Sequence, residues 1–211
     1  MALAIGAVTP WATIQASATC AGVASWRAED GVAWVDLDYA APDAERWLGF
    51  EAKLAPYTRE ALVAGDPRPR AEVRDDGILL IARGVNLAEG AEPEDMVSLR
   101  VWVEAHRVIT LRHRDVRALR LVGESLGAGR GPTDAASFLA TLVDQILGPV
   151  STLVDEIDDQ VAALEDAALG RDVATPRGKI ADLRRRAIAR RRFIGPQAQA
   201  LARLAHLDVG W

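Results

Sequence analysis

Residues 151–169 read STLVDEIDDQVAALEDAAL, and this stretch decides the architecture of the C-terminal part of the chain. Its apolar side chains recur in steps of three and four residues, which places them on one face of an α-helix. They are Val154, Ile157, Val161 and Leu164. Such spacing is typical of a heptad seam, where two helices bury a shared apolar stripe. The remaining positions include six carboxylates and no basic residue. The stretch therefore predicts a helix that packs on a partner and presents an acidic surface.

An oppositely charged helix is predicted directly downstream. Residues 134–170 hold eight acidic and no basic residues, a net charge of −8. Residues 171–211 hold ten basic and three acidic residues, a net charge of +7. The basic segment carries a similar apolar stripe, which includes Ile180, Leu183 and Ile194. Because the connection is short, the two helices are expected to form an antiparallel hairpin. In that hairpin Asp155–Asp159 would face the Arg185–Arg192 region.

Two Gly-Pro pairs interrupt these helices, Gly148-Pro149 in the acidic one and Gly195-Pro196 in the basic one. Proline lacks the donor N–H and clashes with the preceding turn. The sequence therefore predicts that both helices break or bend at these pairs. Thr133 or Asp134 is the predicted cap of the acidic helix.

The region before the hairpin has a mixed α/β pattern. Alternating apolar residues, as in 97–103, predict strands, and Asp76-Gly77 between two apolar runs predicts a β-hairpin turn. The predicted fold is α+β, with a mixed, largely antiparallel sheet flanked by helices and followed by a long antiparallel helical hairpin. The predicted divisions are an N-terminal tail over residues 1–20, an α/β domain over 21–131 and the helical hairpin over 132–211.

Composition and motifs argue against several classes of function. The net charge of −5 is modest, and the single cysteine, Cys20, rules out an internal disulfide. No nucleophile elbow, P-loop or dinucleotide fingerprint is present, so no enzymatic activity and no tightly bound cofactor is expected. The basic run LRRRAIARRRF contains one aromatic residue, Phe193, which argues against nucleic-acid binding. The least charged segment, residues 2–26, contains Pro10 and is not expected to span a membrane.

Four carboxylates of the acidic helix are the candidate metal ligands: Asp155, Glu156, Asp158 and Asp159. Hard divalent cations bind several carboxylate oxygens at once. A row along one helix cannot converge on a single ion without another chain, however. The residues alone therefore leave two readings open, a divalent-cation surface and a solvated or arginine-paired helix face. His106, His113 and His206 have no recognised zinc spacing.

The order of several segments resembles a known family. DPRPRAEV, ILLIARGVNL, EDMVSLRVWVEAHRVITLRHR and GRGPTD precede the acidic helix, and LRRRAIARRRFIGPQAQALARL follows it. Together they resemble the cytoplasmic domain of the CorA-like divalent cation transporters, and most closely the ZntB branch, which is linked to zinc. The resemblance runs from about residue 20 to the end.

The resemblance implies a homopentamer with a cytoplasmic α/β domain, a helix pair beside a stalk helix, and two C-terminal membrane helices. It implies that this chain is the soluble cytoplasmic domain, regulatory or funnel-forming, at the cytoplasmic face of the inner membrane. Contact with the membrane would run only through helices beyond Trp211, and zinc or magnesium would be the cation. The family's pore signature is Gly-Met-Asn or Gly-Val-Asn; Gly84–Asn86 matches it by letters but follows a short strand. The alternative is a free-standing α/β and helical-hairpin module that binds another protein.

Overall fold

The structure is a computed structural model of the 211-residue chain. It describes residues 6–8, 11–15, 27–65, 67–75, 77–87, 90–91, 96–169 and 177–209.

A seven-stranded sheet in the order β1-β2-β3-β7-β6-β5-β4 forms the centre of the described structure. Its strands are β1 Gly6–Val8, β2 Trp11–Gln15, β3 Val32–Asp38, β4 Arg70–Arg74, β5 Gly77–Val85, β6 Met96–Glu104 and β7 Arg107–Arg112. The β2–β3 and β3–β7 pairs are parallel, and the other four pairs are antiparallel. The predicted mixed, largely antiparallel sheet is therefore confirmed.

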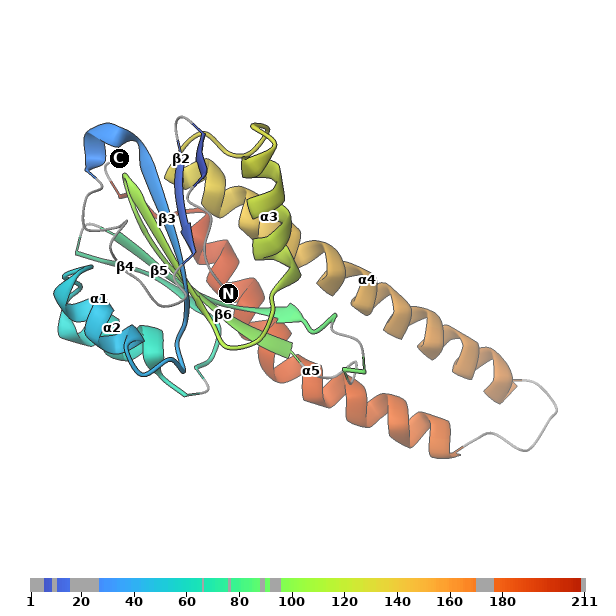
Figure 1. The fold of residues 1–211 in the computed structure, drawn as a ribbon. Coiled ribbons are helices and arrows are strands. Elements are labelled where there is room, and N and C mark those ends of the chain that lie inside the picture. The colour runs from blue at the N-terminus through green and yellow to red at the C-terminus, as the bar shows by residue number, and fades with distance from the viewer. Residues whose placement is uncertain are drawn as a thin grey trace.

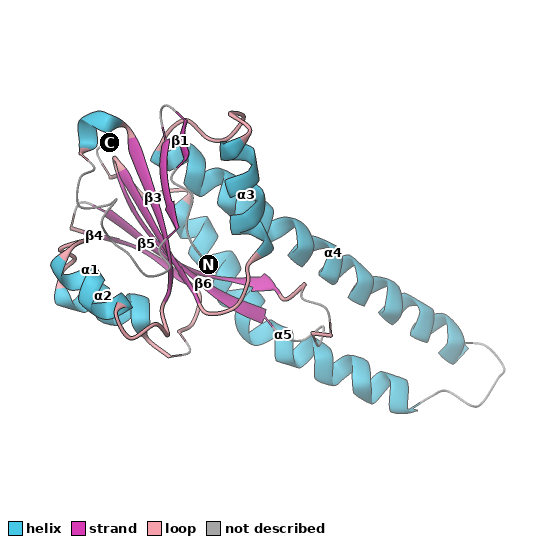
Figure 2. Cartoon of the chain, in the orientation of Figure 1, coloured by secondary structure: helices cyan, strands magenta, loops and turns pink. Residues whose placement is uncertain are grey.

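Helices cover both faces of this sheet (Figures 1 and 2). The short helices α1 and α2 pack on one face, and α3 and the first half of α4 pack on the other. The long helices α4 and α5 lie side by side and extend past the sheet as the predicted hairpin (Figure 1). The helices are α1 Ala44–Phe50, α2 Pro56–Val63, α3 Arg117–Gly127, α4 Ala135–Leu169 and α5 Arg177–Leu204, with a 3-10 turn at Ala28–Asp30.

Strands β3, β5, β6 and β7 each contribute to two apolar cores, because their side chains alternate between the two faces of the sheet. In β3, Val35 and Leu37 belong to the core under α1 and α2. Trp34 belongs to the core under α3 and α4, where its ring centroid lies 5.1 Å from that of Phe138. Phe138 is completely buried, so the first turns of α4 are fixed to the sheet by burial.

A chain of hydrogen bonds joins β3 to β7 on the face of the sheet that α3 and α4 cover. Trp34 Nε1 donates to Thr110 Oγ1 at 3.0 Å, and Thr110 Oγ1 donates to Asp36 Oδ1 at 2.8 Å. Arg112 Nε donates to Asp36 Oδ2 at 2.9 Å. Burial raises the pKa of Asp36, although the Arg112 charge acts to lower it. This network is structural, since it connects the two parallel strands at the middle of the sheet.

The N-terminal segment differs from the predicted tail. Within residues 1–20 the structure has two strands, β1 and β2, which pair with each other. Strand β2 also pairs in parallel with β3, with Trp11 opposite Val32. This segment is rich in apolar and small residues and has few charges, a composition from which a tail was predicted. Its two strands instead extend the sheet. Residues 23–28, VASWRA, have the sequence of a short strand and lie mostly outside the described residues.

Neither Gly-Pro pair ends its helix. Pro149 lies inside α4 and Pro196 lies inside α5, so a break at these pairs is wrong, and a bend there stays a prediction. Buried residues on both sides of the proline, Ile146 and Val150, hold α4 in place. The predicted cap is correct, because the Ser137 backbone N–H donates to Asp134 Oδ1 at 2.7 Å.

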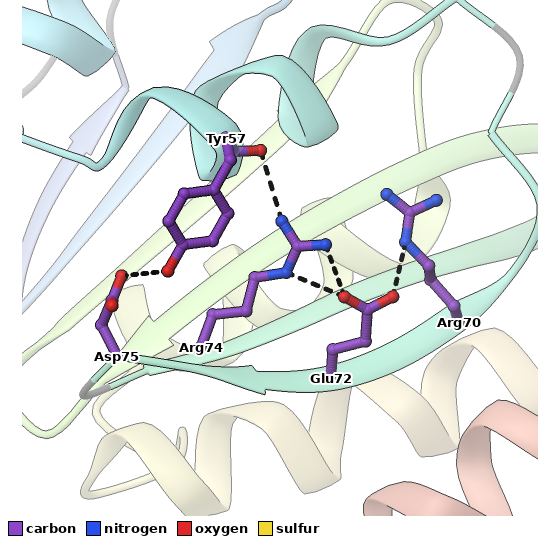
Figure 3. Close-up of polar contacts among 5 residues, drawn as sticks. All are labelled: Tyr57, Arg70, Glu72, Arg74 and Asp75. Atoms are coloured by element: carbon purple, nitrogen blue, oxygen red, sulfur yellow. Dashed lines mark hydrogen bonds and ion pairs between the residues drawn. The ribbon is translucent and has the colours of Figure 1, made fainter.

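The predicted hairpin is confirmed, because β4 and β5 pair antiparallel with Arg74 opposite Gly77. Gly77, predicted to lie in the turn, is instead the first residue of β5. Around it a polar cluster ties α2 to the edge strand β4 (Figure 3). Tyr57 Oη donates to Asp75 Oδ2 at 2.6 Å, which raises the pKa of Tyr57. Glu72 accepts from Arg74 Nε at 2.8 Å and pairs with Arg70 Nε at 3.0 Å. Charged side chains on an edge strand hinder pairing with another chain.

By length and composition one described helical segment, Ala135–Ala167, could cross a membrane; its most apolar window has a mean hydropathy of 1.4. A third of that window is buried inside the protein. The core helix of a soluble protein meets the same criterion, and Phe138, Leu142 and Ile146 of α4 are core residues.

Candidate functional site

The four predicted carboxylates lie together in the second half of α4. All four, Asp155, Glu156, Asp158 and Asp159, are exposed. Among the described residues no group of three or more His, Cys, Asp or Glu side chains is placed to hold a metal ion. An exposed acidic surface attracts cations without chelating them. The role of these four residues in metal binding stays a prediction.

The expected pairing of this acidic surface with the arginines of α5 is not seen among the described residues. Arg185 and Arg186 instead form ion pairs with Asp182 of their own helix, at spacings of three and four residues. Across the hairpin, Arg186 donates to Gln160 Oε1 at 2.8 Å. The reason is geometric, since pairs at these spacings on one helix are nearer neighbours than the facing helix.

The apolar seam is buried less evenly than its heptad spacing predicts. Leu183 is 6% exposed, whereas Val161 and Ile180 are 40% and 44% exposed. The other predicted seam residues, Val154, Ile157, Leu164 and Ile194, are half-buried. A groove of about 470 Å³ remains between the helices, lined by Leu164, Leu183 and small residues such as Ala163 and Gly178. Burial in the seam is therefore deepest at Leu183, and the groove beside it remains open toward the tip.

A larger groove of about 680 Å³ lies where the end of β5 approaches α3 and α4. It is lined mostly by apolar atoms. Its charged residues are Arg117, Asp144 and Glu156, so one of the four predicted acids borders it. Asn86 also lines it, directly after β5 ends at Val85. The segment Gly84–Asn86, which matches the pore signature only in residue type, is thus confirmed as the end of a strand.

A second charged region was not predicted. Arg83 and Arg100 occupy inward positions of β5 and β6 and are 6% and 0% exposed. The Arg100 guanidinium lies 3.6 Å from the centre of the Tyr39 ring and donates to the Gly65 carbonyl at 3.2 Å. The signal in the sequence was an arginine inside each of two apolar strands, because arginine is almost never fully buried without partners.

Comparisons with known proteins give a consistent result. Residues 29–211 match the family model described as CorA-like Mg2+ transporter protein. Over 180 residues the chain is 37% identical to the divalent cation transporter CmaX of Pseudomonas aeruginosa, covering 84% of this chain and 54% of that protein. It is 32% identical over 178 residues to the zinc transport protein ZntB of Yersinia enterocolitica, with the same two coverages. The chain thus spans about half the length of these relatives.

Solved structures share the fold. The full-length CmaX structure superimposes with a TM-score of 0.76 at 36% identity, covering 84% of this chain and 55% of that chain. The ZntB cytoplasmic domain of Vibrio parahaemolyticus gives a TM-score of 0.70 at 28% identity, covering 81% of this chain and 68% of that chain. The matched proteins are transporters and not enzymes, in agreement with the missing catalytic motifs. The predicted resemblance and the predicted fold class are confirmed.

Proposed function

The chain belongs to the family of CorA-like Mg2+ transporter proteins, and from this premise we propose that it is the cytoplasmic domain of a homopentameric membrane transporter of divalent cations. The observation that carries the proposal is the match to the ZntB cytoplasmic domain, which covers 81% of this chain. The domain would lie at the cytoplasmic face of the inner membrane.

We propose zinc as the transported cation. Support comes from the similarity to the zinc transport protein ZntB at 32% identity. The higher identity to CmaX, named as a divalent cation transporter, supports divalent cations as the class. The four exposed acids of α4 would raise the local cation concentration beside the pathway, since clustered charge of one sign attracts counter-ions.

The gene downstream of Trp211 provides the first test of the transporter proposal. It should encode two apolar segments of about 20 residues each, the length that spans a bilayer. The first should be followed by a Gly-x-Asn signature. If neither segment is encoded, the transporter proposal is wrong and the alternative of a free-standing protein-binding module takes its place.

The second test concerns the acidic surface in the full-length transporter. Asp155→Asn, Glu156→Gln, Asp158→Asn and Asp159→Asn are combined in one variant. Uptake of Zn²⁺ into proteoliposomes should fall severalfold at low ionic strength and approach the unmodified rate at high salt, because salt screens exposed charges. Uptake of Mg²⁺ measured in the same vesicles reports the cation preference.

A control variant removes the same number of charges from exposed positions outside the hairpin: Glu45, Glu51, Glu60 and Glu124, each replaced by Gln. It should transport zinc as the unmodified protein does. Equal loss in both variants would mean that net charge matters and that the α4 surface has no special role. Unchanged uptake in the α4 variant would exclude a role for these acids.

A further inference from the structure

The outer face of α5 carries an exposed isoleucine with arginines around it. Ile188 is 59% exposed. On a helix surface, the residues three and four positions before and after a side chain are its nearest neighbours. For Ile188 all four of these residues are exposed arginines: Arg184, Arg185, Arg191 and Arg192. Arg185 also pairs with Asp182, and Arg192 lies over the ring of Phe193. Ile188 and its four arginines form the arginine face of the hairpin.

The outer face of α4 repeats this arrangement with the opposite charge. Ala162 is exposed, and the residues three and four positions before and after it are all acidic and exposed. They are Asp158, Asp159, Glu165 and Asp166. None of these four carboxylates forms an ion pair with another residue in the described part of the chain. Ala162 and its four carboxylates form the acidic face of the hairpin. Its small central residue leaves room for a larger side chain such as isoleucine.

Within one chain the arginine face and the acidic face point away from each other. The two helices contact each other through their opposite sides, where Leu164 and Leu183 line the groove between them. No residue of either face lines this groove. Arg186 donates to Gln160 Oε1 at 2.8 Å across the hairpin. This contact puts the centres of the two faces within about one helical turn of the same level along the hairpin.

From this geometry we propose that the arginine face of one copy of this chain docks on the acidic face of a second copy, with Ile188 packed over Ala162. A large side chain that inserts among four residues of a facing helix is the usual way in which two helices interlock. The charges select the pairing, because two arginine faces or two acidic faces would bring like charges together. A second copy is the favoured partner because the chain itself supplies the complementary face at the same spacing.

The proposed contact uses a different face of each copy. Contacts of this kind form a closed ring when the rotation between copies closes, and the similar level of the two faces suits rotation about an axis roughly along the hairpin. The inference deepens the proposed homopentamer, on which it rests only for closure of the ring. Cations attracted to α4 would compete with the arginines for Asp158 and Asp159.

Cross-linking between two variants of the 211-residue chain tests the contact. Cys20→Ser removes the native thiol from both. One variant then carries Ala162→Cys, and the other carries Ile188→Cys and a mass tag. A short bismaleimide should join the mixed pair at least about tenfold faster than it joins either variant to itself, because docking raises the effective concentration of the two thiols. High salt should slow the mixed reaction, because it screens exposed charges.

Charge reversal separates docking from chance collision. Arg184→Glu and Arg191→Glu, added to the variant with the cysteine in α5, should lower the rate of the mixed reaction to that of self-linking. Asp159→Lys and Asp166→Lys, added to the variant with the cysteine in α4, should restore the rate, since opposite charges again face each other. Failure of this restoration would overturn the proposed pairing.

The matched control is Arg46→Glu combined with Arg120→Glu, which makes the same change of net charge at exposed arginines of α1 and α3. Added to the variant with the cysteine in α5, it should leave the mixed reaction unchanged. An equal loss in this control would show that only net charge matters and would overturn the proposal. Equal rates in mixed and unmixed samples would overturn it as well.

An anionic membrane surface is the competing partner for the arginine face. Binding of the unmodified chain to phosphatidylglycerol vesicles, without faster cross-linking of the mixed pair, would assign this face to the membrane and overturn the contact between copies. Either result leaves the family assignment intact. The transporter proposal is decided separately, by the apolar segments encoded downstream.

Discussion

At the scale of single residues, Gly77 is required to be glycine by a residue far from it in the sequence, Trp102. It begins β5 directly after the hairpin turn, a place where glycine is usual for its backbone freedom. Its structural role is different, because a Cβ atom at this position would lie 2.4 Å from Cζ2 of Trp102. The Trp102 ring lies over the space that the missing side chain leaves, and it donates from Nε1 to Glu104 Oε1 at 2.7 Å.

Gly77→Ala should therefore destabilise the domain by about 1–3 kcal/mol, the usual cost of overpacking. Urea denaturation followed by tryptophan fluorescence measures the change. Gly127→Ala is the control, since nothing lies within 4 Å of a Cβ atom at Gly127. If the two substitutions have the same effect, the ring contact with Gly77 does not constrain the fold.

Asp134 provides a second residue-scale prediction, with a defined pH dependence. Hydrogen bonds from the Ser137 backbone N–H, above all, lower the pKa of Asp134. Its carboxylate therefore stabilises the fold fully above the unfolded-state value of about 3.9. That contribution is lost as the pH falls through the lower folded-state pKa. Asp134→Ala should cost about 0.5–2 kcal/mol at neutral pH, as other N-cap losses do.

Unfolding measured between pH 7 and pH 2 tests this dependence. The difference between Asp134→Ala and the unmodified chain should shrink once the pH is below about 3.9. Asp134→Asn keeps a side-chain oxygen that can cap the helix, and it should cost little at neutral pH. A difference that stays constant with pH would mean that the alanine variant acts through something other than the carboxylate.

At the scale of elements, the α4–α5 hairpin was predictable in outline from its apolar period and its short connection. The depth to which the seam residues are buried was not predictable. Helical spacing indicates which face of a helix is apolar, and it does not indicate how closely the facing helix packs. The prolines show the same limit. A local rule predicts a break at Pro149, yet buried contacts on both sides maintain one helix.

Leu183 and Ile180 test where the hairpin is held. Leu183→Ala should destabilise the hairpin by about 2 kcal/mol or more, because it removes a buried side chain. Ile180→Ala, one turn earlier and 44% exposed, should cost less than about 1 kcal/mol. Amide exchange along α4 and α5 separates hairpin opening from global unfolding. Equal costs would contradict the conclusion that the hairpin is stabilised mainly by the buried Leu183.

At the scale of the whole molecule, the sequence predicted the sheet, the hairpin and the separation of acidic and basic halves. It located four exposed acids on α4 correctly, and it paired them with the wrong partners because ion pairs within α5 are nearer. It missed the burial of Arg83 and Arg100, and the contact of Arg100 with Tyr39, a residue far from it in the chain. Long-range convergence of this kind has no local period, so one sequence does not display it.

The contact between Gln197 and β5 has a mechanical consequence. The Arg83 backbone N–H donates to Gln197 Oε1 at 2.6 Å. This buried bond joins α5 to β5 at a residue beyond Ile81, which pairs with Arg70 at the start of β4. A slide of α5 by one helical turn, about 5.4 Å, would break this bond and leave a buried donor unsatisfied, which costs about 1–3 kcal/mol. The bond therefore couples α5 to the sheet. A small displacement of α5 along the hairpin axis pulls on β5, and a larger displacement breaks the bond and releases α5.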